Sequence, residues 1–447
     1  MSNTDFLTYK KDFTKTLFNN GEALSSSEIK NIATQFIDSN DFPSKKQEDW
    51  RKTDLAKMFK HKYARAEKVD VNEFIVSIYK VRELEANLMV FVNGFLIDEY
   101  SSIISKNLII KNIATAKIEN KDIFTNYYNT SEVFKSNIFA AFNTAYATDG
   151  TFIYIPKNKT VEHPIHIINL SDGNNRKTIS QIRNLIIADE NAEANIIVSH
   201  HSISVNYTLS NTVTEIFANE NSRLSYNIFQ GEGDDAIQFN NTIVEQKRGS
   251  SFSSHYITLC GSLIRNDLKI EHKDENCETD LSGFYLPDRE QHFDNMIYVH
   301  HAKPNCNSKQ LYRGVLDNKA TSVFSGKVLV DKNAQKTNAE QNNNNILLSQ
   351  YAKAHSKPQL EIYADDVKCS HGSTTGQLDK EALFYLQSRG IGFKEARILL
   401  LNAFANKVVD KIKVPEFKRF VKFLIEKRMS GDKIEGQCSM FEECGGC

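Results

Sequence analysis

The sequence predicts a mainly β protein in which a parallel β-helix lies between helical regions at both ends. A polar turn followed by a small residue recurs in a β-rich region, at steps of 30, 28 and 27 residues; these positions are Ala192, Ser222, Ser250 and Cys277. Sandwich turns come every 8–12 residues or so, whereas a solenoid repeats at this longer interval because its stacked turns share one core. A β-sandwich remains the alternative, since the next comparable turn, at residues 318–321, follows a longer gap.

Composition narrows the class of protein. The 447 residues are 40% hydrophobic and 25% charged, with 55 Lys and Arg against 56 Asp and Glu. This near-neutral balance argues against a nucleic-acid or membrane-surface partner bound by bulk charge. The first residues lack a secretory pattern and no apolar run has membrane length, so we expect a cytoplasmic protein. Seven cysteines, an odd number, indicate reduced thiols.

The N-terminal region, residues 1–130, is predicted to be mainly helical with short strands. Apolar residues recur there at spacings of three and four, as in Phe13, Leu17, Ile29, Ala33 and Phe36. Within it, residues 43–55 contain the single tryptophan, interpreted as an anchor on a helix that begins at Pro43. Strands begin near residue 87, and helical spacing returns briefly between 131 and 147.

The β-helix is predicted to span residues 131–376, and its last third is polar. The run from Gln341 to Asn345 fits either a ladder of stacked side chains inside the solenoid or a low-complexity linker. Four nearby residues could supply the acid and base of a carbohydrate-cleaving enzyme, and the alternative is a solvated turn; they are Asp288, Glu290, His292 and Asp294.

A short stretch near the end of this region carries candidate metal ligands. If residues 365–371 are extended, alternation places four side chains on one face; these are Asp365, Val367, Cys369 and His371. Thiolate and imidazole together suit a soft or borderline metal such as Fe or Zn. Two ligands are too few for a closed site, and a small buried cysteine beside a hydrogen-bonded histidine is the alternative interpretation.

Residues 377–447 are predicted to form a helical, partner-binding region with a cysteine-rich tail. Asp379 fits the N-cap of a helix over 380–389 closed by Gly390, a second helix spans 393–412, and a third follows Pro415. Their apolar stripes exceed what so few helices bury, which predicts a protein partner. The tail cysteines could bind metal or exchange disulfides, or belong to a flexible tail; they are Cys438, Cys444 and Cys447. No nucleotide-binding or hydrolase motif occurs, so we expect neither a directly bound nucleotide nor enzyme activity.

Four stretches resemble one family, the SufB/SufD scaffold subunits of iron–sulfur cluster assembly. They are residues 43–55 with Glu48, Trp50, Thr53 and Asp54, and residues 149–156, 162–165 and 365–391. The SufD branch is the more similar, because SufB sequences carry a cysteine at the position of Leu386 and lack the Cys-Ser-His pattern of residues 369–371.

The resemblance implies a right-handed parallel β-helix that pairs with a SufB-like subunit through the helix ends and binds a SufC-like ATPase. Iron or a nascent cluster would be held transiently at the subunit interface, with His371 contributing and Cys369 beside it. ATPase contacts are expected on the C-terminal helices, from Asp379, Glu381, Leu383, Phe384, Arg389, Gly390, Leu399, Leu400 and Phe404.

Two other functions compete with this scaffold role. One is a carbohydrate-active β-helix enzyme. The other is a stand-alone homodimer that delivers iron with the tail cysteines as ligands. An isolated chain could also pair with itself, since an uncapped β-helix end exposes strand edges.

Overall fold

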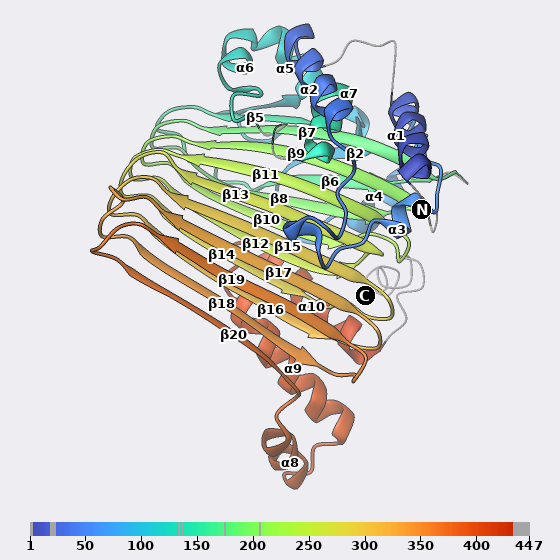
Figure 1. The fold of residues 1–447 in the computed structure, drawn as a ribbon, viewed down its shortest axis with the longest axis vertical. Coiled ribbons are helices and arrows are strands. Elements are labelled where there is room, and N and C mark those ends of the chain that lie inside the picture. The colour runs from blue at the N-terminus through green and yellow to red at the C-terminus, as the bar shows by residue number, and fades with distance from the viewer. Residues whose placement is uncertain are drawn as a thin grey trace.

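The chain folds into a parallel β-solenoid of about seven turns (Figure 1). The computed structural model describes residues 3–17, 24–132, 135, 137–147, 149–173, 176–204 and 207–431. From β5 onward, successive strands alternate between two sheets, and each pairs in parallel with the strand two places along. Before β5, β1 pairs in parallel with β7 and β2 with β6, whereas β2·β3 and β4·β5 are antiparallel. The predicted fold class is therefore confirmed, and the β-sandwich alternative is wrong because the ladders are parallel.

The two sheets have the following members. The first sheet contains β4 (Ile109–Asn112), β5 (Thr151–Ile155), β7 (Thr178–Ala188), β9 (Thr208–Ala218), β11 (Ile237–Gln246), β13 (Leu263–His272), β15 (His292–His301), β17 (Thr321–Val330) and β19 (Lys353–Ile362), with β1 (Ala64–Arg65) beside β7. The second contains β2 (Asn87–Val92), β3 (Phe95–Leu96), β6 (Ile165–Ser171), β8 (Glu193–Ser202), β10 (Arg223–Gly231), β12 (Ser251–Cys260), β14 (Glu278–Tyr285), β16 (Asn307–Leu316), β18 (Asn338–Leu347) and β20 (Lys368–Gly376).

The recurring polar turn is the corner between the two sheets. At this corner one residue has a left-handed backbone, with φ between 56° and 67°; these residues are Asn191, Asn221, Gly249, Asn276 and Asn305. Asn and Gly tolerate this region better than other residues, which explains the pattern. The next residue is small and buried, and these residues stack as a column: Ala192, Ser222, Ser250, Cys277 and Cys306.

The repeat therefore continues through the longer gap that the sequence shows before residues 318–321. Cys306 follows Cys277 by 29 residues, so the predicted turn at 318–321 is not the next member of the series. Residues 318–321 instead lie at another corner, between β16 and β17. The asparagine run also has a definite structure, because it lies in β18, where Asn343 and Asn345 are buried and bond Tyr285 Oη at 2.9 and 2.7 Å. The linker interpretation is thus wrong.

Helices near the N-terminus cover the first turns. They are α1 (Asn3–Leu17), α2 (Ser27–Ser39), α3 (Ala56–Phe59), α4 (Glu73–Tyr79), α5 (Ile113–Glu119), α6 (Lys121–Tyr127) and α7 (Ile138–Tyr146), with the 3-10 helices η1 (Glu48–Trp50) and η2 (Asp98–Tyr100). No helix begins at Pro43, since the segment after it forms a turn before η1. Trp50 is nevertheless an anchor, buried against Phe139 and Phe239.

Three helices follow the last strand: α8 (Lys380–Ser388), α9 (Phe393–Val409) and α10 (Pro415–Ser430). The last two pack on the second sheet, where Leu401 and Phe417 join a cluster with Phe284. The predicted end of the second helix, Ile412, lies three residues too far, because the helix ends at Val409. Helix α8 projects from the body and has no buried residue (Figure 1).

Among the described residues, none of the helices has both the length and the apolar character needed to cross a membrane.

Candidate functional site

The described part of the solenoid ends in two edge strands, β19 and β20. Each forms a ladder with only one neighbour in its sheet, β17 or β18. One side of each backbone therefore presents N–H and C=O groups that no strand of this chain satisfies. The predicted metal ligands lie on this end of the molecule.

Cys369 and His371 share the inner face of β20, as predicted. They lie in register with Ala339 and Gln341 of β18, which are both buried. Cys369 packs against the interior core, whereas the side chain of His371 is exposed. The difference follows from position, since no further turn among the described residues covers the inner face of β20.

Asp365 does not join this face. The strand begins at Lys368, and residues 363–367 form the corner that leads into it. The prediction of a shared face is wrong for Asp365 because it treated the corner as extended chain. Val367 packs against the same core as Cys369.

The local environment keeps the Cys369 thiol unreactive in the free chain. Burial raises the pKa of this thiol, and a backbone hydrogen bond at Ala339 opposes the shift only in part. The thiol is therefore protonated at neutral pH and becomes a ligand only when a cation displaces its proton. With His371 it supplies two donors, which leaves the coordination of iron or zinc incomplete.

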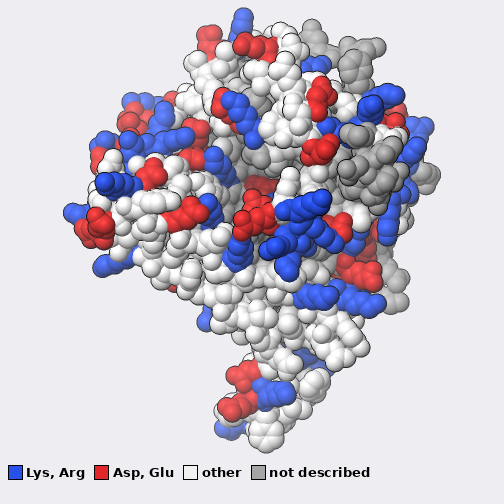
Figure 2. Space-filling view, in the orientation of Figure 1, with Lys and Arg blue, Asp and Glu red and all other residues white. Residues whose placement is uncertain are grey.

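Helix α8 presents a second exposed surface. Asp379 caps it as predicted, accepting hydrogen bonds from the backbone N–H of Glu381 and Ala382 at 2.9 and 3.1 Å. Phe384 is 72% exposed, and the adjacent Tyr385, which sequence reasoning missed, is 57% exposed. Few charged side chains cover the surface between the body and α8 in the view of Figure 2.

The predicted partner-binding residues of α9 fall into two groups. Leu399 is 50% exposed. Phe404 instead packs on the solenoid, with the Arg313 guanidinium 4.4 Å from its ring centre and donating to its carbonyl oxygen at 3.1 Å. Leu400 is half-buried.

Two family models match nearly the whole chain. The model described as the SUF system FeS cluster assembly, SufBD core domain, matches residues 169–404. This chain belongs to the SufBD family. The model of the SufBD protein N-terminal region matches residues 3–167.

Individual SufBD proteins are also similar. An iron-sulfur cluster assembly SufBD family protein of Synechocystis sp. is 30% identical over 390 residues, covering 85% of this chain and 86% of that protein. The iron-sulfur cluster assembly protein SufD of Escherichia coli is 28% identical over 306 residues, covering 67% and 71%. SufD of Bacillus subtilis is 25% identical, covering 72% and 74%. These names agree with the resemblance to the SufD branch.

The residues proposed for carbohydrate cleavage do not share a groove in this SufBD chain. Asp294 is fully buried, 2.7 Å from Arg265 Nη1, and accepts a hydrogen bond from Thr53. Burial lowers the pKa of His292 to about 3, so its ring is neutral at physiological pH. Glu290 lines a cavity of 470 Å³ beside His292, in which the other charged neighbours are mostly lysines. A glycosidase needs two carboxyl groups flanking one bond, an arrangement that these four residues do not form.

The tail cysteines Cys438, Cys444 and Cys447 lie outside the described residues. The four cysteines that the structure describes are free thiols: Cys260, Cys277, Cys306 and Cys369.

Proposed function

We propose that this chain is a non-enzymatic scaffold subunit that pairs with a SufB-like subunit through its open end and holds iron or a nascent cluster there. The observation that carries the proposal is the position of Cys369 and His371 on the inner face of an edge strand. In the described part of the chain no turn covers the donors on that face, so a partner that continues the solenoid would bury them and supply the missing ligands.

Apolar side chains around the same end support a protein partner. Tyr351 and Tyr363, at the two ends of β19, are 61% and 63% exposed, and Ile362 is 38% exposed. Large exposed side chains along an unpaired strand edge are typical of an interface. A second copy of the chain could occupy the surface in the absence of the SufB-like subunit.

The proposed SufC-like ATPase binds the C-terminal helices. Phe384 and Leu399 are exposed apolar side chains there, and Asp379, Glu381, Leu383, Arg389, Gly390 and Leu400 remain predicted contacts. Only residues 377–379 separate β20 from α8, so a force on α8 acts at the end of the strand that carries His371. In this mechanism ATP is used by the partner, and movement of the helices opens the interface.

A co-purification experiment tests the scaffold role. The full-length chain is expressed with a SufB-like and a SufC-like subunit, captured through a tag, and assayed for partners, iron and ATPase activity. We expect a ternary complex in which His371→Ala and Cys369→Ala lower cluster formation at least tenfold. Ser370→Ala is the matched control, because Ser370 lies between them on the outer face of β20. Equal cluster formation by all three variants would contradict the proposal.

The compartment proposed for this complex is the cytoplasm. The free thiols of Cys277 and Cys306, which are neighbours in the corner column, fit a reducing environment.

A further inference from the structure

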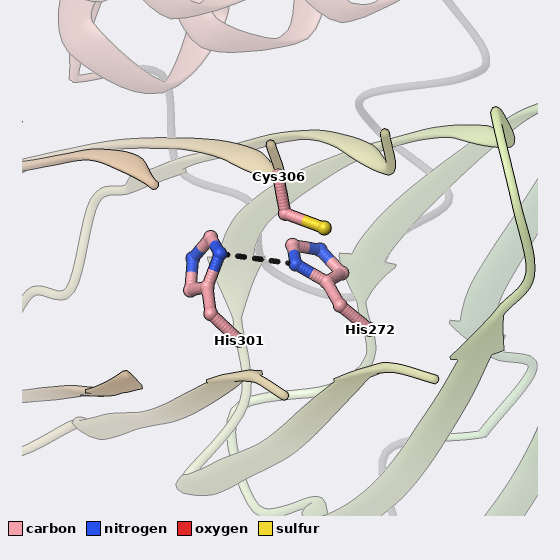
Figure 3. Close-up of side chains that lie close together, drawn as sticks. All are labelled: His272, His301 and Cys306. Atoms are coloured by element: carbon pink, nitrogen blue, oxygen red, sulfur yellow. Dashed lines mark hydrogen bonds between the residues drawn. The ribbon is translucent and has the colours of Figure 1, made fainter. Parts of the chain in front are cut away.

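A separate group of donor side chains lies inside the solenoid, away from the open end. His272 ends β13, His301 ends β15, and Cys306 belongs to the corner before β16. One ligand atom from each lies within 4.8 Å of the others, and all three side chains are fully buried. Figure 3 shows the two imidazole rings and the thiol pointing toward one another.

Packing accounts for the cysteine but not for the histidines. Cys306 occupies the column of small corner residues, where any small side chain fits. His272 and His301 occupy one inner position of the first sheet, which holds Ala188, Ala218, Gln246 and Val330 in neighbouring strands. Two adjacent imidazoles at a position suited to alanine or valine must be desolvated, and such burial calls for specific partners.

Hydrogen bonds orient the His272 ring so that its unprotonated nitrogen, Nδ1, faces His301. Gln246 Nε2 donates to the carbonyl oxygens of Ser250 and Glu278 at 3.2 and 3.1 Å, so its Oε1 is free to accept. Thr279 donates its only hydroxyl proton to that Oε1 at 2.6 Å. The hydroxyl oxygen of Thr279 must therefore accept from His272 Nε2, 2.8 Å away. In a neutral ring this leaves the lone pair on Nδ1.

His301 likewise directs its Nδ1 atom toward the centre of the group. His301 Nδ1 lies 3.2 Å from His272 Nδ1, and its Nε2 contacts the Ser308 hydroxyl at 2.9 Å. Each ring thus has a hydroxyl on its far nitrogen, the arrangement that orients histidine ligands in metal sites. With metal–nitrogen bonds of about 2.0–2.1 Å, two nitrogens of a tetrahedral site lie about 3.3 Å apart. The observed separation is close to that value.

We propose that His272 Nδ1, His301 Nδ1 and Cys306 Sγ form a buried site for a borderline divalent metal ion of the Zn²⁺ type. On binding, the metal–sulfur bond replaces the thiol S–H, whose proton leaves to solvent. In the metal-free chain, His301 Nδ1–H donates to the bare His272 Nδ1. On binding, the ring proton of His301 is on Nε2, where it forms a hydrogen bond to Ser308 Oγ, and Nδ1 is left with a lone pair for the metal. No electron is transferred.

A further donor is available nearby. Cys277 Sγ and Cys306 Sγ both contact the carbonyl oxygen of Asp274, at 3.2 and 3.4 Å. Only His272, His301 and Cys306 have ligand atoms within 4.8 Å of one another, so Cys277 Sγ would have to move toward them to act as a fourth ligand. The resulting set of two sulfurs and two nitrogens is typical of closed structural zinc sites. Such an ion would join the ends of β13 and β15 to the corners that follow them and stabilise the turns on which the open end rests.

Metal analysis of the isolated full-length chain tests this site. Because the donors are enclosed, Zn²⁺ or Co²⁺ is supplied in the growth medium so that loading can accompany folding. The background variant carries Cys369→Ser and serine at Cys438, Cys444 and Cys447, which removes the other candidate thiol ligands. We expect about one metal ion per chain, and for Co²⁺ a thiolate charge-transfer band with the visible bands of tetrahedral coordination.

Two variants copy residues that neighbouring turns already use. Cys306→Ser places serine where Ser222 and Ser250 stand in other turns, and His272→Gln repeats Gln246. Both should fold, as circular dichroism would verify, and should lower metal content at least tenfold and abolish the charge-transfer band. The proposal would be overturned if the background variant contained no metal after growth with Zn²⁺ or with Co²⁺. It would also be overturned if Cys306→Ser left the Co²⁺ charge-transfer band unchanged. The result is independent of the scaffold role, because neither partner nor cluster takes part.

Discussion

Arg265 joins the N-terminal segment to the solenoid, and its removal gives the sharpest prediction about stability. Its guanidinium is 3% exposed, lies 2.7 Å from Asp294 and 3.0 Å from Asp267, and donates to the Asp49 carbonyl oxygen at 2.9 Å. It also stacks 3.7 Å from the ring centre of Trp50. One side chain therefore holds η1 against β13 and β15.

Arg265→Ala should destabilise the protein by about 3–5 kcal/mol, the cost of removing one partner from a buried ion pair. Lost stacking on Trp50 adds on the order of 1 kcal/mol. Burial raises the pKa of Asp294, and Arg265 opposes that shift, so in the variant this carboxyl binds a proton. Protonation removes the unpaired buried charge, which keeps the loss of stability near the lower end of that range.

Hydrogen exchange followed by mass spectrometry measures the effect where it arises. We expect residues 48–54 to lose protection first, because Arg265 holds this segment directly, and the denaturation midpoint to fall with it. Arg248→Ala is the matched control: this arginine is 56% exposed, pairs with Glu275 at 2.7 Å, and should change stability by no more than about 0.5 kcal/mol. If the two variants differ by less than about 1 kcal/mol, the segment is held by apolar packing rather than by Arg265.

Four further predictions concern separate parts of the molecule. Thr279→Val removes the hydroxyl that orients His272 and should weaken Co²⁺ binding about 10- to 100-fold, measured by competition with a chelator, while a metal affinity equal to that of the parent chain would contradict the hydrogen-bond chain. The hydrogen bond between His300 and Glu271 raises the pKa of His300, although burial lowers it. Protonated His300 therefore stabilises the folded protein fully below about pH 6.5, and this contribution is lost as pH rises through the raised pKa. The stability difference between the parent chain and His300→Gln should therefore shrink between acidic and alkaline pH, and a difference constant in urea titrations across that range would count against it. Asn221→Ala should cost about 1 kcal/mol and Asn221→Gly almost nothing, because the backbone at this corner is left-handed; equal melting temperatures for the two would argue against corner strain. Phe384→Ala should abolish capture of the ATPase yet shift stability by less than about 0.5 kcal/mol, since α8 buries no residue, and retained capture would exclude this aromatic residue as an anchor.

The repeat could be recognised in the sequence because one local requirement recurs at five successive corners of one series. A left-handed residue followed by a small buried residue favours Asn or Gly and then Ala, Ser or Cys, although the corner before β18 has Lys336 and Thr337. This pattern can be read without any knowledge of the core. The member at Asn305 was missed although it repeats the Asn-Cys pair of residues 276–277, and Asn318 at another corner has a similar pattern. Local chemistry therefore predicted the solenoid, while the count of its turns required the strand register.

The candidate ligands show the same limit. Alternation within one strand placed Cys369 and His371 on a common face, which needs no tertiary information. The contact of Thr53 with Asp294 joins residues 241 positions apart, and no spacing rule reaches that far. His272 and His301 had a usable signal, since their separation of 29 residues matches the repeat and places both at one register position.

Position along the solenoid explains why the two groups of donors should differ in use. His301 and His371 both face inward, but β17 continues the sheet beyond His301, whereas β20 is the last strand of its sheet in the described chain. The donors around His301 are therefore enclosed by this chain and can complete a site from its own residues. Those around His371 remain open on one side in the described chain, and in the proposed scaffold role a partner supplies their remaining ligands. In the two proposed roles, an inward-facing histidine within the stack stabilises neighbouring turns, whereas the same geometry at the end of the stack offers a ligand to a partner.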